Sequence, residues 1–354
     1  MVRKFSLVLI VALILIGAPV LFAGGAAEEA AVEGELPRVQ LQLAHSSNPG
    51  GAAGAAAFRD YVAEASDGRM TVNLIDYQAL GSAREVADQI RLGELEITAL
   101  ATAGLTHIWP DLQMVNVPFI FTDREVFWEV MKDDEYVSYI RDNVLAASRN
   151  TLRYLGAAEN SVRHLYVNEE IRVPQDLSDY GIQIRVQESP IMQAVWTGLG
   201  AGEVVAMSGG ERDAAVQAGT LDAIEGSFGG AWRGGNLSVL GHAVLTGHVY
   251  DYMHYFMNNE FYESLPAEYQ QIIDDAIIVA IDAHNQAALE SERESIVEAE
   301  DAGVWVYQPT AAELQQWQDR AIPAGEQFVQ GQVAETFQQL TLETIERITR
   351  MLNN

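Results

Sequence analysis

The sequence contains no cysteine and almost no lysine, and these two absences exclude several classes of protein. Zero cysteines exclude disulfides, thiolate metal sites and cysteine nucleophiles, so the apolar core alone must hold the fold. Of 21 basic residues only Lys4 and Lys132 are lysines, and 50 acidic residues bring the formal net charge to −29. Because such a surface repels a phosphate backbone, we expect no nucleic-acid partner.

An acidic, lysine-poor surface is also typical of a protein that works in high salt. Dissolved ions screen repulsion between surface carboxylates, so the folded state gains stability as salt rises. We therefore predict adaptation to a saline habitat. The alternative is a protein that is merely acidic.

Long apolar runs are scarce, and the one near the start reads as a targeting segment. A basic beginning is followed by an apolar stretch over Leu7–Ala23 and then by small residues, the pattern of a secretory signal peptide. We expect residues 1–23 to be cleaved and 24–35 to be a disordered leader. The alternative is an uncleaved membrane anchor. The absence of cysteine excludes a lipid anchor, so the expected location is the periplasm.

The remaining chain alternates strand-like and helix-like segments in two separated blocks. Strands alternating with helices predict an α/β architecture with largely parallel pairing. The strand-like segments are 38–47, 70–77, 95–100, 152–158, 161–168, 181–186 and 221–227, and the helix-like segments are 52–66, 82–94, 191–201 and 209–219.

A long segment without glycine or proline follows Pro266 and ends at Gly303. Its apolar residues recur at helical spacing, and its first half is more apolar than its second. We predict one helix that is buried first and exposed later, long enough to lie across two domains. The alternative is two helices with a break near His284.

Motifs for covalent chemistry or metal binding are missing. The seven histidines form no HxH, HxxxH or HExxH pattern, and there is no GxSxG or Walker A sequence. The alternative of an exported α/β enzyme is therefore not supported by any recognisable nucleophile, metal-site or cofactor motif. We expect no enzymatic activity, no metal and no cofactor.

Two arginines lie in strand-like stretches of the second block, Arg163 in SVRHLYV and Arg185 in GIQIRV. An unpaired guanidinium is costly to bury, so each arginine must reach water, pair with an acidic residue or serve an anionic ligand. A guanidinium holds a carboxylate by two parallel hydrogen bonds. By alternation alone, Arg185 points away from Ile184 and Val186.

Several stretches together, in order and spacing, resemble one family. They are ALGSAREVADQIRLGELEIT (79–98), VNVPFIFTDRE (115–125), VPQDLSDYGIQIRVQESP (173–190), GLGA (198–201), ERDAAVQAGTLDAIEGS (211–227) and NNEFYESLP (258–266). On these motifs the chain resembles the DctP-type periplasmic solute-binding proteins of TRAP transporters, from about Pro37 to Thr310.

The resemblance implies the fold. The family has a two-domain periplasmic-binding-protein-like α/β fold, with a long helix spanning both domains and a ligand cleft between them. Domain I would comprise 36–160 and 249–288, and domain II would comprise 161–248 and 289–354.

The resemblance also implies the site. Arg185 falls on the arginine of the family's G-x-[KQ]-I-R-V stretch, which forms the main salt bridge with a ligand carboxylate, and Arg163 matches a second arginine. Aromatic residues are expected to line the ligand, with ordinary core packing as the competing account. The full set of expected ligand contacts is Arg185, Arg163, Trp232, Phe119, Glu225 and Asp213.

Departures from the family pattern concern the rest of the ligand. Gly226 replaces an asparagine that often contacts ligand, and Asp213 replaces the tyrosine of the Glu-x-Tyr motif. The resemblance therefore implies an organic acid without assigning a sialic acid or a C4-dicarboxylate. The expected function is capture of that acid and delivery to TRAP-type membrane permease subunits. The alternative is a sensory protein that presents a small acid to a receptor.

Overall fold

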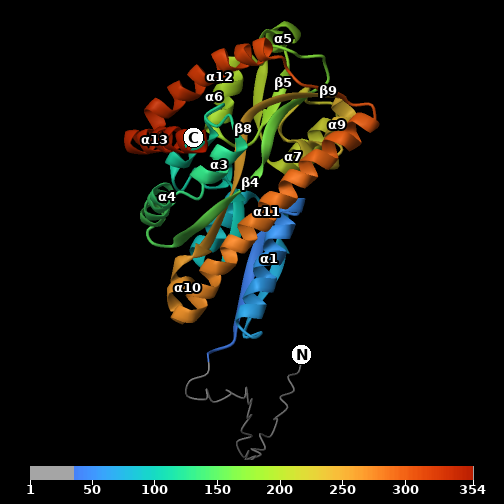
Figure 1. Ribbon diagram of the computed structural model, residues 1–354. Coiled ribbons are helices and arrows are strands. Elements are labelled where there is room, and N and C mark those ends of the chain that lie inside the picture. Colours follow the sequence, from blue (N-terminus) through green and yellow to red (C-terminus); the bar gives the residue numbers. More distant parts are fainter. Residues whose placement is uncertain (1–35, 354) are drawn as a thin grey trace, which may run out of the picture. The chain divides into compact units, whose positions relative to one another are not determined.

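The computed structural model describes residues 36–353, and from Arg38 onward these residues form one compact unit. The expected signal peptide and leader lie outside the described residues. The unit is built on one mixed sheet of nine strands in the order β2-β1-β3-β8-β4-β7-β5-β6, with β9 beside β8 (Figure 1). The strands are β1 Val39–His45, β2 Met70–Asp76, β3 Ile97–Ala101, β4 Leu152–Val167, β5 Gln183–Val186, β6 Glu203–Ala206, β7 Ala223–Ser227, β8 His242–Asn258 and β9 Trp305–Tyr307.

Strand direction divides this sheet into two parallel sets joined by an antiparallel pair. Strands β2, β1 and β3 run parallel to one another, and so do β7, β5 and β6. The long strands β4 and β8 are antiparallel to each other and to their neighbours β7 and β3. The expected parallel pairing is therefore confirmed for the two outer sets, while the centre of the sheet is antiparallel.

Helices and 3-10 turns connect the strands, as the alternating pattern predicts. Those of the first block are α1 Pro49–Ala65, η1 Tyr77–Ala79, α2 Ala83–Leu92, η2 Thr102–Gly104, η3 Pro110–Asn116, α3 Arg124–Val130 and α4 Asp134–Ala147. Those of the second block are α5 Pro174–Tyr180, α6 Pro190–Leu199, α7 Gly209–Gln217, α8 Phe228–Arg233 and α9 Asn236–Leu240. The chain then forms α10 Asn259–Ser264, α11 Ala267–Asp301, α12 Ala311–Gln332 and α13 Glu335–Leu352.

Local signals explain where several of these helices begin and end. Ser82 caps α2 in a reciprocal capping box with Glu85, and Gly93 ends that helix at a φ of 73°. Ser208 and Glu211 form the same box at the start of α7. Because these caps are encoded by neighbouring residues, α2 and α7 lie where their sequence pattern predicts.

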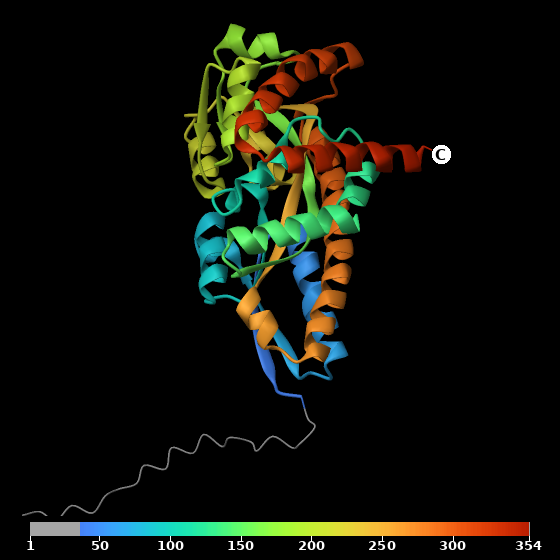
Figure 2. The same cartoon turned by 90° about the vertical axis from the view of Figure 1, so that its left-hand side faces the viewer.

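The predicted long helix is confirmed as α11, which runs for 35 residues without a break. His284, where a break was considered, is buried in mid-helix and its Nδ1 lies 2.9 Å from the hydroxyl of Tyr255. Helix α11 packs along α1, β4 and α8, so it follows both blocks of the sheet (Figures 1 and 2).

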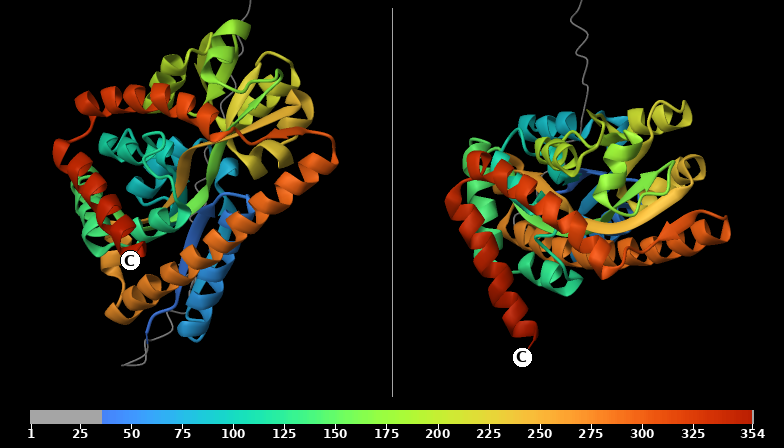
Figure 3. Two further views of the ribbon diagram at one scale, coloured as in Figure 1. Left: turned by 45° about the horizontal axis from the view of Figure 1, so that its top comes forward. Right: turned by 90° about the horizontal axis from the view of Figure 1, so that it is seen from above.

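The C-terminal helices return from the second block to the first. Helix α12 packs on α6, and α13 packs on α3 and α4 (Figure 3). A core of buried apolar residues follows this path, from Ile90 of α2 to Trp317 of α12. A second core, around Tyr166 and Phe228, fills the other face of the second block.

The two parallel sets point their carboxyl ends at the same stretch of β4 and β8. Strand β3 ends at Ala101, which pairs with Met253, and β7 ends at Ser227, which pairs with Arg163. Between these levels only β4 and β8 continue, over residues 159–162 and 250–252. Ligands of open α/β sheets bind beyond the carboxyl ends of strands. We therefore expect a ligand site beside this stretch of β4 and β8, which we call the bridge.

Candidate functional site

Arg185 lies on β5, one residue before that strand ends, and is 4% exposed. It pairs with Ile224 of β7, so its side chain leaves the sheet on the face that carries the second core. The side chain is thus buried, whereas alternation alone suggested a solvated face. Nε and Nη2 both donate to the carbonyl oxygen of Met207, at 3.0 and 2.5 Å.

Arg185 has no carboxylate partner within ion-pair distance among residues 36–353. Burial lowers the pKa of Arg185 to about 10. The negative charge of Glu225 opposes this shift, and the positive charge of Arg212 lowers the pKa further. At neutral pH the side chain is therefore a buried cation whose charge the protein leaves without a direct counter-ion.

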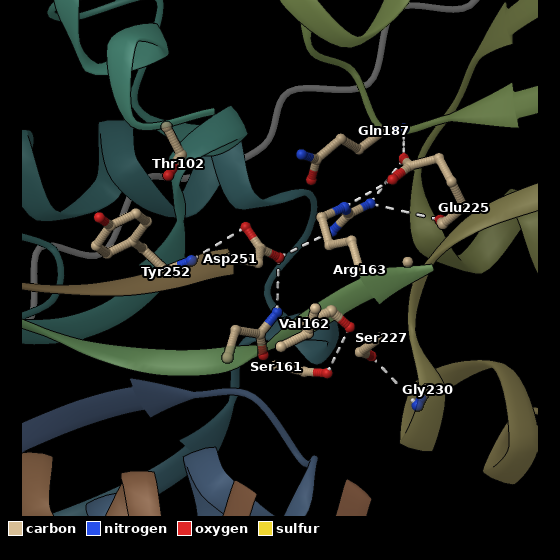
Figure 4. A network of polar contacts seen from close by, with 12 residues as sticks. Thr102, Ser161, Val162, Arg163, Gln187, Glu225, Ser227, Gly230, Asp251 and Tyr252 are labelled. Carbon is tan, nitrogen blue, oxygen red and sulfur yellow. Dashed lines mark hydrogen bonds and ion pairs between the residues drawn. The ribbon is translucent and has the colours of Figure 1, made fainter. Parts of the chain in front are cut away.

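Arg163 lies on β4 and leaves the sheet on the opposite face, beside Leu165 of the first core. Its Nε and Nη2 each donate to a carboxylate oxygen of Glu225 at 2.7 Å, and its Nη1 donates to Asp251 at 2.8 Å (Figure 4). All three side chains are almost completely buried. The sheet thus brings two of the expected ligand contacts, Arg163 and Glu225, together as an ion pair, and it adds Asp251 from β8.

The carboxyl group of Glu225 is the acceptor at the centre of this cluster. Burial opposes its ionisation, but the charge and hydrogen bonds of Arg163, together with the nearby His248, outweigh burial and hold its pKa well below the usual range. His248 Nε2 lies 3.5 Å from Glu225, and burial keeps the pKa of that imidazole low. The backbone N–H of Gln187 donates to Glu225 at 3.3 Å, which ties β5 to the cluster.

Asp213 lies on α7 and binds a third arginine. Its Oδ1 accepts from Nε of the neighbouring Arg212 at 2.7 Å and from Nδ2 of Asn236 at 2.8 Å. The structure therefore shows Asp213 in contact with a cation of its own chain. Arg212 is near enough to Arg185 for its charge to lower the pKa of that side chain.

The two predicted aromatic residues lie in different places. Phe119 has a positive φ of 57°, and its N–H donates to the carbonyl oxygen of His248 at 2.8 Å, beside the Arg163 cluster. Trp232, on α8, instead donates its Nε1 hydrogen to Glu298 of α11 at 2.8 Å. Phe119 thus borders the site and Trp232 joins α8 to the long helix.

Gly226 lies where a side chain would reach the cluster. A Cβ there would stand 3.9 Å from Nη2 of Arg163, and the residue has a φ of 159°. Glycine therefore leaves the face of Arg163 uncovered at this position.

A polar network braces the bridge from the side of α11. Arg124 of α3 binds Glu159 of β4 and Glu292 of α11, each at 3.0 Å. Glu292 also accepts from the hydroxyl of Ser161 at 3.0 Å, and the N–H of Glu159 donates to Asn285 at 2.7 Å. Burial raises the pKa of Glu159 to about 7 despite Arg124. This network connects residues 159–161 of β4 to α3 and α11.

Sequence reasoning missed Asp251, His248, Gln187 and Arg212. Asp251 and His248 lie on β8, which the sequence pattern did not reveal as a strand. Arg212 lies on α7, and no sequence motif singled it out. The irregular alternation of polar residues in HVYDYMH was the one available sign that β8 carries buried polar groups.

Other kinds of site find no support among the described residues. Within 36–353 no three His, Asp or Glu side chains are grouped to hold a metal ion. No helix in that range has the length and apolar character to cross a membrane. A cavity of about 470 Å³ does exist, but it lies between α3, β4 and α11 and is lined by other residues, including Trp128 and Ile281.

Comparison with known families decides the identity of this fold. Residues 42–332 match the model of a family described as bacterial extracellular solute-binding protein, family 7, or DctP. The chain belongs to this family. This match confirms the resemblance inferred from the sequence. The family consists of solute-binding proteins and is not an enzyme class.

Curated relatives of this family member cover most of the chain. It is 29% identical over 241 residues to a solute-binding protein of Verminephrobacter eiseniae, covering 68% of this chain and 69% of the relative. It is 24% identical over 299 residues to the C4-dicarboxylate-binding periplasmic protein DctP of Rhodobacter capsulatus, covering 83% of this chain and 86% of the relative.

Solved structures share the fold. The sugar acid binding protein DctPAm of Advenella mimigardefordensis, solved in complex with galactonate, superposes with a TM-score of 0.80 at 22% identity. The match covers 88% of this chain and 99% of that protein. The chain therefore has the periplasmic-binding-protein-like α/β fold that the resemblance implied.

Proposed function

We propose that this protein is the extracytoplasmic binding component of a TRAP-type transporter, which captures an organic acid by its carboxylate and hands it to membrane permease subunits. The observation that carries the proposal is Arg185, a buried guanidinium without a counter-ion among the described residues. An uncompensated buried cation is costly, and a ligand carboxylate would neutralise it.

The binding residues follow from the contacts that the protein itself leaves open. Arg185 uses its Nε and Nη2 edge on Met207, so Nη1 is available to the acid. Arg163 offers one remaining Nη1 hydrogen, while the carboxylates of Glu225 and Asp251 hold it in place and offset its charge. Phe119 borders the apolar part of the acid. Asp213 affects binding through Arg212, which it contacts, and Trp232 does so by holding α8 in place.

Names of relatives support the chemical class of the ligand. One relative is named for C4-dicarboxylates and one solved neighbour holds galactonate, which is also an organic acid. The protein's net charge of −29 repels any anion, so local cations are needed to bind one.

Capture proceeds by closure of two domains on the acid. We place domain I at 36–160 and 249–288 and domain II at 161–248 and 289–354, with a cleft between them. The crossings between these domains then coincide with the bridge of β4 and β8 and with α11, whose residues would absorb the hinge motion. Delivery follows export across the inner membrane and removal of residues 1–23, which leaves a periplasmic protein without a lipid anchor.

A screen of carboxylic acids against their uncharged amides tests this function. The purified protein should be stabilised against heat by at least one acid and not by its amide, because the amide lacks the charge that pairs with Arg185. The bound acid should be recovered unchanged, as expected of a binding protein. Equal stabilisation by acid and amide, or conversion of the acid, would contradict the proposal.

A further inference from the structure

The three arginines near the carboxyl ends of β5 and β7 differ in how many of their donors the protein uses. Arg163 is bound along two edges, by Glu225 and by Asp251. Arg185 and Arg212 are each bound along the Nε and Nη2 edge only, Arg185 by Met207 and Arg212 by Asp213. Among the described residues nothing accepts from Nη1 of either. Two guanidinium groups therefore each keep an open edge.

Both open guanidinium groups belong to the same corner of the fold. Arg185 binds the carbonyl of Met207, which directly precedes Ser208, the cap of α7. Arg212 follows Ser208 by four residues, about one helical turn, so Ser208 and Arg212 lie on the same face of α7. The corner is uncrowded, because a Cβ at Gly209 or at Gly210 would meet no atom within 4 Å.

The side chain of Arg212 is held rather than free. Asp213 accepts from both its Nε and its Nη2, at 2.7 and 2.6 Å, and Asn236 of α9 holds the same Asp213 oxygen. Only 18% of the Arg212 side chain is exposed. An arginine fixed along one edge presents the other edge in a constant direction, which lowers the entropic cost of binding.

The charge of Arg212 also acts on Tyr77, which follows β2 of the first parallel set. Tyr77 follows β2, and burial raises the pKa of its phenol, while the charge of Arg212 lowers it and that of Asp251 raises it. The charge of Arg212 thus acts on Tyr77 of the first block and on Arg185 of the second. The charge of Asp251, on the bridge, acts on Tyr77 as well.

We propose that Arg212 is a second anion contact beside Arg185 and that Asp213 is the positioning residue that orients it. This inference rests on the proposed binding of an acid at Arg185. Two like charges at one corner repel each other, and an acid with a second anionic group relieves that repulsion by pairing with both. Arg212 therefore selects acids with a second anionic group over acids with one.

Matched pairs of acids test this selection on the full protein by isothermal titration. The pairs are butyrate and succinate, valerate and glutarate, and gluconate and glucarate, which differ mainly in the second carboxylate. For at least one pair the dianion should bind about 10- to 100-fold more tightly, the range expected for one charge-assisted contact. The Arg212→Leu variant should lose that difference and keep its affinity for the monoanion within about twofold.

Two further variants separate position from charge. Arg233→Leu removes the same charge from α8, where Arg233 is exposed and 3.6 Å from Glu294, and should leave the preference for the dianion unchanged. Asp213→Asn keeps the shape but loosens Arg212, so it should lower the dianion's affinity without changing that of the monoanion. A general loss of fold would weaken both acids equally.

The outcomes are distinct. Equal affinity for both members of every pair, a preference that survives Arg212→Leu, or binding of monoanions alone would each overturn the role of Arg212. Failure of every acid to bind would instead overturn the proposed function at Arg185, on which this role depends.

Discussion

At the scale of single residues, the Arg163 cluster shows why a buried ion pair is sensitive to the loss of one partner. Arg163 is almost fully buried, and both oxygens of Glu225 accept from it at 2.7 Å. Removing one charge of such a pair leaves the other buried and unpaired, which costs more than the pair itself contributes. The stability of this region therefore depends on Glu225 far more than on any surface ion pair.

The Glu225→Gln variant should lower the free energy of unfolding at pH 7 by about 3 kcal/mol. Because folding lowers the pKa of Glu225, its contribution is present above its ordinary value of 4.5 and is lost as pH falls below that value. The difference between wild type and variant should thus shrink in acid. Urea denaturation across pH 3–8 measures it, with Glu129→Gln at the exposed Lys132 pair as control. A variant no weaker than this control would contradict the account.

Glu159 should behave in the opposite way. Burial raises its pKa from 4.5 to about 7, so the folded protein binds this proton more tightly than the unfolded chain. The contribution of Glu159 is complete below pH 4.5 and is lost as pH rises to about 7, by roughly 3 kcal/mol. The stability of wild type relative to Glu159→Gln should fall over this interval, and parallel pH curves for the two proteins would refute the shift.

At the scale of elements, the contact of α1 with α11 depends on glycine. A Cβ at Gly54 would collide with the hydroxyl of Tyr255 and would approach the carbonyl of Ala280 to 3.0 Å. Gly54→Ala should therefore destabilise the protein by about 1–3 kcal/mol through overpacking, although alanine favours helix. Gly331→Ala in α12, where a Cβ meets nothing within 4 Å, is the matched control. Thermal unfolding should show the first variant melting lower and the second unchanged or higher.

Elements with local signals could be predicted from the sequence, and those without them could not. Helix α2 has its cap and its final glycine beside it, and α11 has helical periodicity over 35 residues. Strand β8 has no such signal, since both its faces are buried and its polar residues do not alternate. Its antiparallel course therefore had to come from the tertiary structure.

The same limit applies to the site. Arg185 and Arg163 could be chosen from strand patterns and the family resemblance, and Glu225 lay in a matching motif. Asp251 became visible only once β8 was placed beside β4. The role of Asp213 depends on Arg212 and Asn236, whose side chains meet only in the folded protein.

At the scale of the whole molecule, the net charge of −29 governs the response to salt. Repulsion among the acidic residues weakens the folded state, and screening by dissolved ions reduces that repulsion. The melting temperature should therefore rise between 0.05 and 3 M NaCl. It should rise less when uncharged sucrose, instead of salt, is added at low ionic strength. Thermal unfolding monitored by circular dichroism measures this, and a melting temperature that stays constant or falls with salt would argue for a merely acidic protein.

The proposed ligand capture is also a property of the whole molecule, because it would join a single cation to the proposed closure of two domains. In the proposed function, the buried Arg185 provides the charge, and β4, β8 and α11 are the elements that connect the two proposed domains. The loss of Arg185 should therefore abolish binding without unfolding the protein, since no ion pair among residues 36–353 depends on this side chain.

The most direct test is titration of the best-binding acid into wild type and Arg185→Leu, with Arg233→Leu as the charge-matched control. We predict at least a 100-fold loss of affinity in Arg185→Leu, as for a lost charge-assisted contact in a buried site, and less than a twofold change in Arg233→Leu. An acid that binds Arg185→Leu as tightly as wild type would contradict the assignment of Arg185 as the carboxylate anchor.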